Sequence, residues 1–337
     1  MKFAPIIYLI GMLLCILSLF MLVPAFVDWF YGSENWPAFV GSSISTLFVG
    51  LILFFSNKGS ATEHLELRQA FLLTNSAWIS IALFGSLPFL LSNIEMSFID
   101  AFFESTSGIT TTGATVIENL EAKSHGILIW RALLQWLGGV GIIVMALAVL
   151  PMLSIGGMQL FKTESYETPD KVVPKAASFA AGISIVYITL TVIWALMLWG
   201  AGMPIFDSIA HAMTTLATGG YSTKSESLAA FNSSTIEIII IFGMLVGSLP
   251  FVHYLTLSKN GLKNLIKDDQ VKLFLTMVLF VVLIISLYLS FNNMPYLDAL
   301  RLASFNVVSI ITGTGFGTSN FSNWGGFPTT ILLILMF

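Results

Sequence analysis

The sequence predicts an all-α polytopic membrane protein whose tandem repeats surround a central pore. Three observations support this fold class. First, 56% of the 337 residues are hydrophobic and only 9% are charged, whereas a soluble domain carries about 25% charged residues. Second, the apolar residues gather in runs of roughly 20, the length that crosses about 30 Å of hydrocarbon. Third, one short motif recurs three times between these runs.

The apolar runs define the expected transmembrane helices. The last run starts near Phe327 and reaches only about half way across the bilayer by Phe337. We therefore expect the polypeptide to continue beyond Phe337, because a helix ending in lipid would leave its carbonyls unsatisfied. The seven complete runs are residues 6–27, 39–55, 70–91, 127–153, 176–199, 236–257 and 273–291.

The basic residues predict the orientation. With the N-terminus in the cytoplasm, ten of the 14 Lys and Arg residues face the cytoplasm, as the positive-inside rule requires. The net charge of −4 gives no indication of a nucleic-acid partner.

The motif occupies three intervals that are too long and too apolar to be simple loops. In each interval an Asp opens a short helix, and a Thr/Gly segment follows. The distance from the Asp to the aligned Gly is 13 residues in the first two repeats and 17 in the third, a difference of about one helical turn. The aligned pairs are Asp100 with Gly113, Asp207 with Gly220, and Asp298 with Gly315.

These intervals predict re-entrant pore helices followed by non-helical segments that line a pore. Irregular backbone at membrane depth is tolerated where it is buried in protein or lines an aqueous cavity. We predict that Asp100, Asp207 and Asp298 are the N-caps of the pore helices. The C-terminal end of each helix dipole then favours a cation at the Thr/Gly segment, where backbone carbonyls can replace the hydration shell of a potassium ion.

The Thr/Gly segments resemble the one-glycine selectivity filters of the Trk/Ktr/HKT superfamily of potassium transporters. The segments are Thr110–Thr115, Ala217–Ser222 and Thr312–Gly317, and the stretch Gln135–Ile142 is also similar to the bacterial members. The two helices before the first repeat resemble the Trk branch, so the closest match is the membrane subunit of bacterial Trk potassium-uptake systems. Matched residue by residue, the potassium-binding filter consists of Thr111, Thr112, Gly113, Thr218, Gly219, Gly220, Gly313, Thr314 and Gly315.

The resemblance implies four repeats in one chain, with potassium as the transported ion and no resident cofactor. It also implies the lipid bilayer of the bacterial inner membrane as surroundings, a homodimer, and a cytosolic nucleotide-binding regulatory subunit (TrkA-like). The expected organisation is an N-terminal helix pair at 1–60 and pore repeats at 61–165, 166–262 and 263–337, of which the third is incomplete and the fourth absent.

Two other functional classes compete with this hypothesis. A sodium-coupled secondary transporter of a small solute also uses broken helices, but such folds have inverted repeats, whereas these three repeats share one orientation. An enzyme would need facing nucleophile, base or carboxylate groups, and the sequence offers none, so we expect no enzymatic activity.

Several single residues have more ordinary interpretations. Glycines in transmembrane helices often allow close packing, and we expect this of Gly138, Gly139 and Gly141. A lone histidine such as His211 is typically a packed, hydrogen-bonded group, and no His has partners at metal-ligand spacing. Glu104 and Arg301 lie within pore helices, where ionisable groups are functional candidates, although Arg301 could equally make structural hydrogen bonds.

Overall fold

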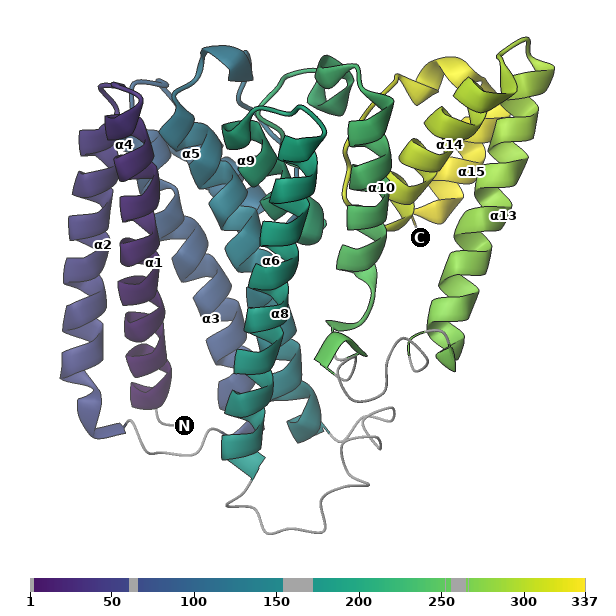
Figure 1. Cartoon of the computed structure of the whole chain (residues 1–337). Coiled ribbons are helices and arrows are strands. Elements are labelled where there is room, and N and C mark those ends of the chain that lie inside the picture. The colour runs from purple at the N-terminus through teal and green to yellow at the C-terminus, as the bar shows by residue number, and fades with distance from the viewer. Residues whose placement is uncertain are drawn as a thin grey trace. The chain divides into compact units, whose positions relative to one another are not determined.

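The computed structural model describes residues 3–60, 66–153, 172–251, 253–255, 265 and 267–336, and the described regular structure is helical (Figure 1). Five of its helices are long and apolar enough to cross a membrane, and two shorter apolar helices accompany them. The predicted class, an all-α polytopic membrane protein, is therefore confirmed. The chain divides into two compact units, which are described separately.

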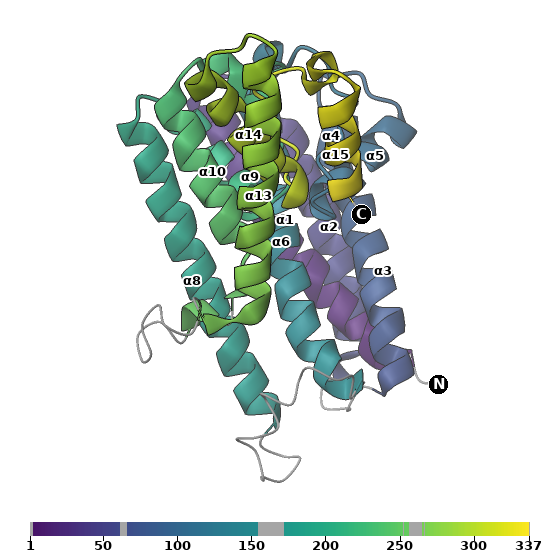
Figure 2. The ribbon, with the colours of Figure 1, turned by 90° about the vertical axis from the view of Figure 1, so that its right-hand side faces the viewer.

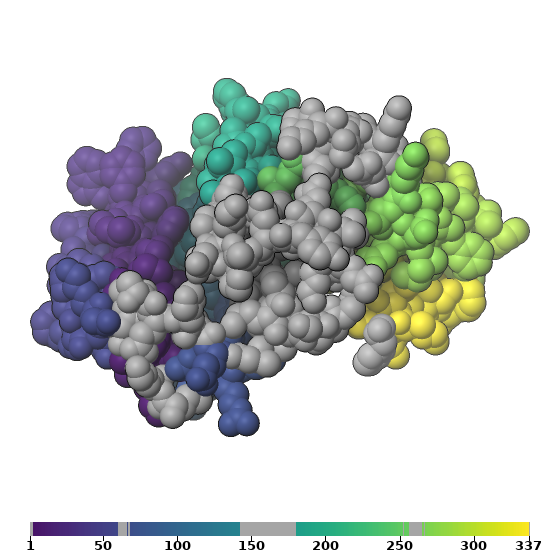
Figure 3. Space-filling model, turned by 90° about the horizontal axis from the view of Figure 1, so that it is seen from below, coloured from purple at the N-terminus to yellow at the C-terminus, as the bar shows by residue number. Residues whose placement is uncertain are grey.

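The first unit contains the N-terminal helix pair and the first repeat. The close approach of α1 (Ala4–Phe30) to α2 (Trp36–Ser56) depends on glycine, because a Cβ on Gly11 would lie 2.6 Å from the Phe54 nitrogen and 2.8 Å from the Gly50 oxygen. Small residues permit such backbone contact between membrane helices. In Figure 3, α1, α2 and α3 form the purple-to-blue part of the molecule. The helices are α1 (Ala4–Phe30), α2 (Trp36–Ser56), α3 (Leu67–Gly85), α4 (Leu87–Leu91), α5 (Phe98–Ile109) and α6 (His125–Leu153).

The second unit contains the second and third repeats from Ala181, within α8 (Val172–Gly200), together with Thr111–Gly113 and Asn119–Glu121. Helices α13 and α14 run side by side in it (Figure 2). The helices are α8 (Val172–Gly200), α9 (Ile205–Leu216), α10 (Ser234–Ser248), α13 (Asp269–Phe291), α14 (Tyr296–Ile311) and α15 (Gly326–Leu335).

The lengths of the three pore helices agree with the motif spacing. Helices α5 and α9 each have 12 residues and α14 has 16, so the third is longer by the one turn that the sequence predicted.

The prediction of one continuous helix over residues 236–257 is wrong, because the helix is shorter. Helix α10 ends at Ser248, and Leu249 is extended at φ −78° and ψ 152°. The cause is Pro250, because the proline ring disfavours helical backbone angles in the residue before it.

Candidate ion-conducting site

The three pore helices end in the same backbone geometry. One residue past each C-cap, the chain enters the left-handed region, at Thr111 (φ 56°), Thr218 (φ 49°) and Gly313 (φ 70°). A β-branched residue rarely adopts this conformation, and holding one there costs about 1–3 kcal/mol. Such strain at Thr111 and Thr218 is typical of functional sites.

The glycine two residues further on also has positive φ in all three repeats. The values are 80° at Gly113, 74° at Gly220 and 84° at Gly315. In each segment, two left-handed residues have a single residue between them. This arrangement rotates successive peptide planes in a way that regular structure does not, and glycine adopts it at little steric cost. The aligned glycines therefore share a positive φ, as the repeats predicted.

The second and third Thr/Gly segments lie against each other. A Cβ on Gly220 would be 1.9 Å from the Thr314 carbonyl oxygen and 3.2 Å from the Gly315 carbonyl carbon. Thr314 itself is fully buried. Thr111–Gly113 of the first segment also belong to the second unit, which therefore contains residues of all three segments.

The predicted N-caps are wrong by three residues. The N-cap positions are taken by Ser97, Pro204 and Pro295, and the aspartates Asp100, Asp207 and Asp298 lie in the first turn instead. A carboxylate anywhere in the first turn still complements the helix dipole. An N-cap, however, needs a non-helical backbone, which the residue three positions earlier supplies in each repeat.

Two of these aspartates accept hydrogen bonds from side-chain hydroxyls. Asp207 is buried and accepts a 2.6 Å hydrogen bond from Thr223. Asp100 accepts a 2.7 Å hydrogen bond from the Ser97 hydroxyl, which in turn accepts from the Asp100 amide at 3.2 Å. Each aspartate thus secures the start of its pore helix.

The ionisable residue Glu104 in α5 is completely buried and paired. Its carboxylate accepts from Nε of Arg131 at 2.7 Å, and both side chains are at most 1% exposed. Arg131 comes from the first turns of α6, 27 residues further along the chain. Removing one member of such a pair strands the other charge at a cost of about 3–5 kcal/mol.

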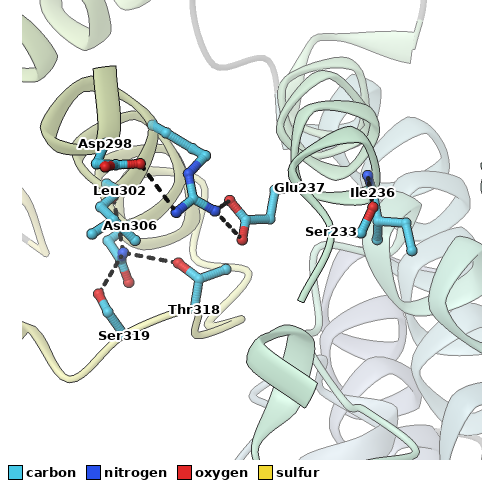
Figure 4. Close-up of polar contacts among 9 residues, drawn as sticks. Ser233, Ile236, Glu237, Asp298, Leu302, Asn306, Thr318 and Ser319 are labelled. Atoms are coloured by element: carbon cyan, nitrogen blue, oxygen red, sulfur yellow. Dashed lines mark hydrogen bonds and ion pairs between the residues drawn. The ribbon is translucent and has the colours of Figure 1, made fainter. Parts of the chain in front are cut away.

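The ionisable residue Arg301 in α14 joins the third pore helix to α10. Its guanidinium donates to both carboxylate oxygens of Glu237, at 2.9 and 3.0 Å, and lies 3.7 Å from Asp298 (Figure 4). Glu237 is 6% exposed and Arg301 is 30% exposed. Of the two interpretations that the sequence left open for Arg301, the structural one therefore accounts for its contacts.

Hydrogen bonds connect the loops that follow the Thr/Gly segments of successive repeats. The Glu121 carboxylate accepts from the hydroxyl and the amide of Ser225, both at 2.7 Å, and the Ser225 hydroxyl hydrogen bonds hold the pKa of Glu121 below its ordinary value. Further along, the Gly317 amide donates to the Ser227 hydroxyl at 3.2 Å, and the Gly317 carbonyl accepts from the Ala229 amide at 3.3 Å.

Glycine packing brings a transmembrane helix against the end of its pore helix. A Cβ on Gly138 would lie 1.9 Å from the Ile109 carbonyl oxygen, so the packing role predicted for Gly138 is confirmed. The ring of Trp78 lies 4.0 Å from a Cβ on Gly141, which is an ordinary contact. Gly247, which no sequence pattern singled out, packs in the same way: its Cβ would be 2.9 Å from the Leu216 carbonyl oxygen at the end of α9.

The described residues offer no acidic, histidine or cysteine cluster that could hold a metal ion. His211 is buried, with Nδ1 2.8 Å from the Asp207 carbonyl and Nε2 3.0 Å from the Ser222 hydroxyl. The remaining cation ligands near the site are backbone carbonyls and threonine hydroxyls. Neutral oxygens of this kind suit an ion that must both enter and leave.

Comparison with known proteins identifies the family. The family model described as "TrkH: Cation transport protein" matches residues 36–337. The chain belongs to this family. The resemblance drawn from the Thr/Gly segments is thereby confirmed, and the family comprises transport proteins rather than enzymes.

Individual relatives of this TrkH-family chain agree along its whole length. It is 38% identical to the Trk system potassium uptake protein TrkH of Salmonella typhimurium, covering 100% of this chain and 71% of that protein. It is 36% identical to the Trk system potassium uptake protein TrkI of Halomonas elongata, with 100% and 68% covered. The crystal structure of the potassium transporter TrkH from Vibrio parahaemolyticus matches with a TM-score of 0.91 at 36% identity, over 99% of this chain and 70% of that one.

Proposed function

We propose that this chain conducts potassium across a bacterial membrane as the membrane subunit of a Trk-type uptake system. The observation that carries the proposal is the shared pattern of positive φ in three Thr/Gly segments, each at the C-terminal end of a short helix. The helix dipoles and neutral backbone oxygens favour a weakly held cation there. The relatives named as potassium uptake proteins agree with potassium as that cation.

The proposed filter is made by the backbone carbonyls of the three segments. Its residues are Thr111, Thr112, Gly113, Thr218, Gly219, Gly220, Gly313, Thr314 and Gly315. The proposed organisation keeps the helix pair at 1–60 and the repeats at 61–165, 166–262 and 263–337. The similar φ angles at equivalent positions support the presence of three repeats.

The surroundings belong to the same proposal. We place the protein in the inner membrane with its N-terminus in the cytoplasm, because ten of the 14 Lys and Arg residues then lie on the cytoplasmic side. We propose that it acts as a homodimer with a TrkA-like cytosolic nucleotide-binding subunit, as the family resemblance implies.

Rubidium tracer uptake tests the function. The full-length protein is expressed in a bacterial strain without its own potassium uptake, and uptake is measured with potassium or sodium as competitor. We expect potassium, but not sodium, to block uptake. Equal block by both ions would refute potassium selectivity, and an absence of uptake from correctly folded protein supplied with its regulatory subunit would refute the pathway itself.

A further inference from the structure

One polar side chain occupies the same position in each of the three pore helices. Glu104, His211 and Asn306 each precede the aligned glycine of their repeat by nine residues. All three are at most 1% exposed. Their chemistry differs, since one is a carboxylate, one an imidazole and one an amide, so residue type alone does not reveal the correspondence.

In the first two repeats this side chain reaches the hydroxyl two residues beyond the aligned glycine. Thr115 donates to both carboxylate oxygens of Glu104 at 3.0 Å, and the Val116 amide donates to the same group at 3.1 Å. Nε2 of His211 lies 3.0 Å from the Ser222 hydroxyl. Because a carbonyl can only accept, Nδ1 of His211 donates to Asp207, and Nε2 of the neutral ring accepts from Ser222.

In the third repeat, the pore-helix side chain bonds to residues three and four positions beyond the aligned glycine instead of two. The residue two beyond its aligned glycine is Gly317, which has no hydroxyl, and Asn306 instead donates to Thr318 at 3.2 Å and to Ser319 at 3.4 Å (Figure 4). The Asn306 amide also donates to the carbonyl of Leu302, one turn earlier, at 2.9 Å. Each pore helix thus holds the chain that leaves its Thr/Gly segment.

In the first and third repeats, a second hydrogen bond joins the pore helix to its Thr/Gly segment. The Ser107 hydroxyl donates to the Ala114 carbonyl at 2.6 Å, and the Ser309 hydroxyl donates to the Phe316 carbonyl at 2.7 Å. These carbonyls directly follow the aligned glycines and are turned toward their own pore helices. In the second repeat the equivalent Thr214 hydroxyl bonds within its own helix instead, to Ala210 and His211.

We propose that Glu104, His211 and Asn306 are positioning residues that set ion selectivity by fixing the outer end of each Thr/Gly segment. This inference rests on the proposed potassium filter. The helix C-terminus fixes one end of each segment, and the buried hydrogen bond fixes the other. Ligand oxygens must stay within about 0.5 Å of their working geometry, so releasing one end lets them fit a smaller ion.

Asn306 gives the sharpest test because the chain contains a matched control. Asn292 also donates from its amide to the carbonyl four residues earlier, Tyr288, at 2.9 Å, but it is exposed at the end of α13. Rubidium uptake with potassium and sodium as competitors is compared for wild type, Asn306→Leu and Asn292→Leu. We expect Asn306→Leu to lower the preference for potassium over sodium about 2- to 13-fold, the factor that corresponds to one hydrogen bond, and Asn292→Leu to leave it unchanged.

Two more variants distinguish positioning from general stability. Asn306→His carries the side chain that performs this task in the second repeat, and we expect it to restore much of the selectivity. The double variant Thr318→Val with Ser319→Ala removes the other end of the contact from half-buried positions, and it decides the matter if Asn306→Leu does not fold.

The outcomes separate the two proposals. Potassium selectivity that survives in Asn306→Leu, or in the double variant when Asn306→Leu does not fold, would overturn the positioning role while leaving potassium transport intact. A wild-type protein that does not prefer potassium would overturn the proposed function, and the positioning role with it.

Discussion

Replacing Gly220 with alanine should convert a selective pathway into a poorly selective one. A Cβ at this position would lie 1.9 Å from the Thr314 carbonyl oxygen, whereas real Cβ atoms keep at least 3.0 Å. One of the two segments must therefore move by about 1 Å, twice the tolerance of roughly 0.5 Å for a preorganised site. The φ of 74° adds about 1–2 kcal/mol of strain for any residue with a Cβ.

Two other glycines separate the clash from the strain. Gly315 has a similar φ of 84°, but no described atom lies within 4 Å of its Cβ position. Gly32 has φ 70° and equally open surroundings in the loop between α1 and α2. Gly315→Ala therefore introduces backbone strain without a clash inside the candidate filter. Gly32→Ala introduces the same strain at a position far along the sequence from any Thr/Gly segment.

Rubidium uptake with potassium and sodium as competitors measures the effect. We expect Gly220→Ala to lose at least tenfold in potassium preference, which corresponds to about 1.4 kcal/mol. Gly315→Ala should lose less, and Gly32→Ala should transport like the wild type. If Gly220→Ala kept the selectivity of Gly32→Ala, then the contact between the second and third segments would not govern the ligand geometry, and the argument would fail.

Three further predictions concern stability. Arg131→Met should lower the free energy of unfolding by about 3–5 kcal/mol because it removes the ion-pair partner of the buried Glu104 carboxylate. Adding Glu104→Gln should recover part of the lost stability in thermal denaturation. An Arg131→Met variant as stable as the wild type would contradict the prediction. The depressed pKa of Glu121 contributes stability above its unfolded pKa near 4.5, and this stability is lost as the pH falls through the lower pKa of the folded state. Thermal denaturation of wild type and Glu121→Gln from pH 6 to pH 3 should therefore show a difference in melting temperature that shrinks as the pH falls. A difference that stays constant would exclude this linkage. Gly11→Leu should push α1 away from the α2 backbone, so we expect little monodisperse protein by size exclusion, and a normal yield would show that the two helices need not touch.

Local signals explain why so much of the architecture could be predicted. An apolar run of sufficient length must be a helix in lipid, because no other element satisfies its own backbone there. The spacing from Asp to Gly fixed the relative lengths of the three pore helices, since helix rise is constant. The same reasoning failed at the N-caps, because Asp100 favours a helix start from anywhere in the first turn, while the cap depends on the backbone angles of Ser97.

The sequence by itself determined the membrane class, the three copies of the Asp and Thr/Gly motif, and the aligned glycines that take positive φ. These follow from composition and from spacing within about 20 residues, where the chain's own geometry relates one residue to the next. Only the tertiary structure decided which buried charges pair, such as Arg131 with Glu104 across 27 residues, and which hydroxyls Glu104, His211 and Asn306 reach. The physical reason is that desolvation obliges each buried polar group to find a partner, whereas the packing of helices determines which partner lies within reach.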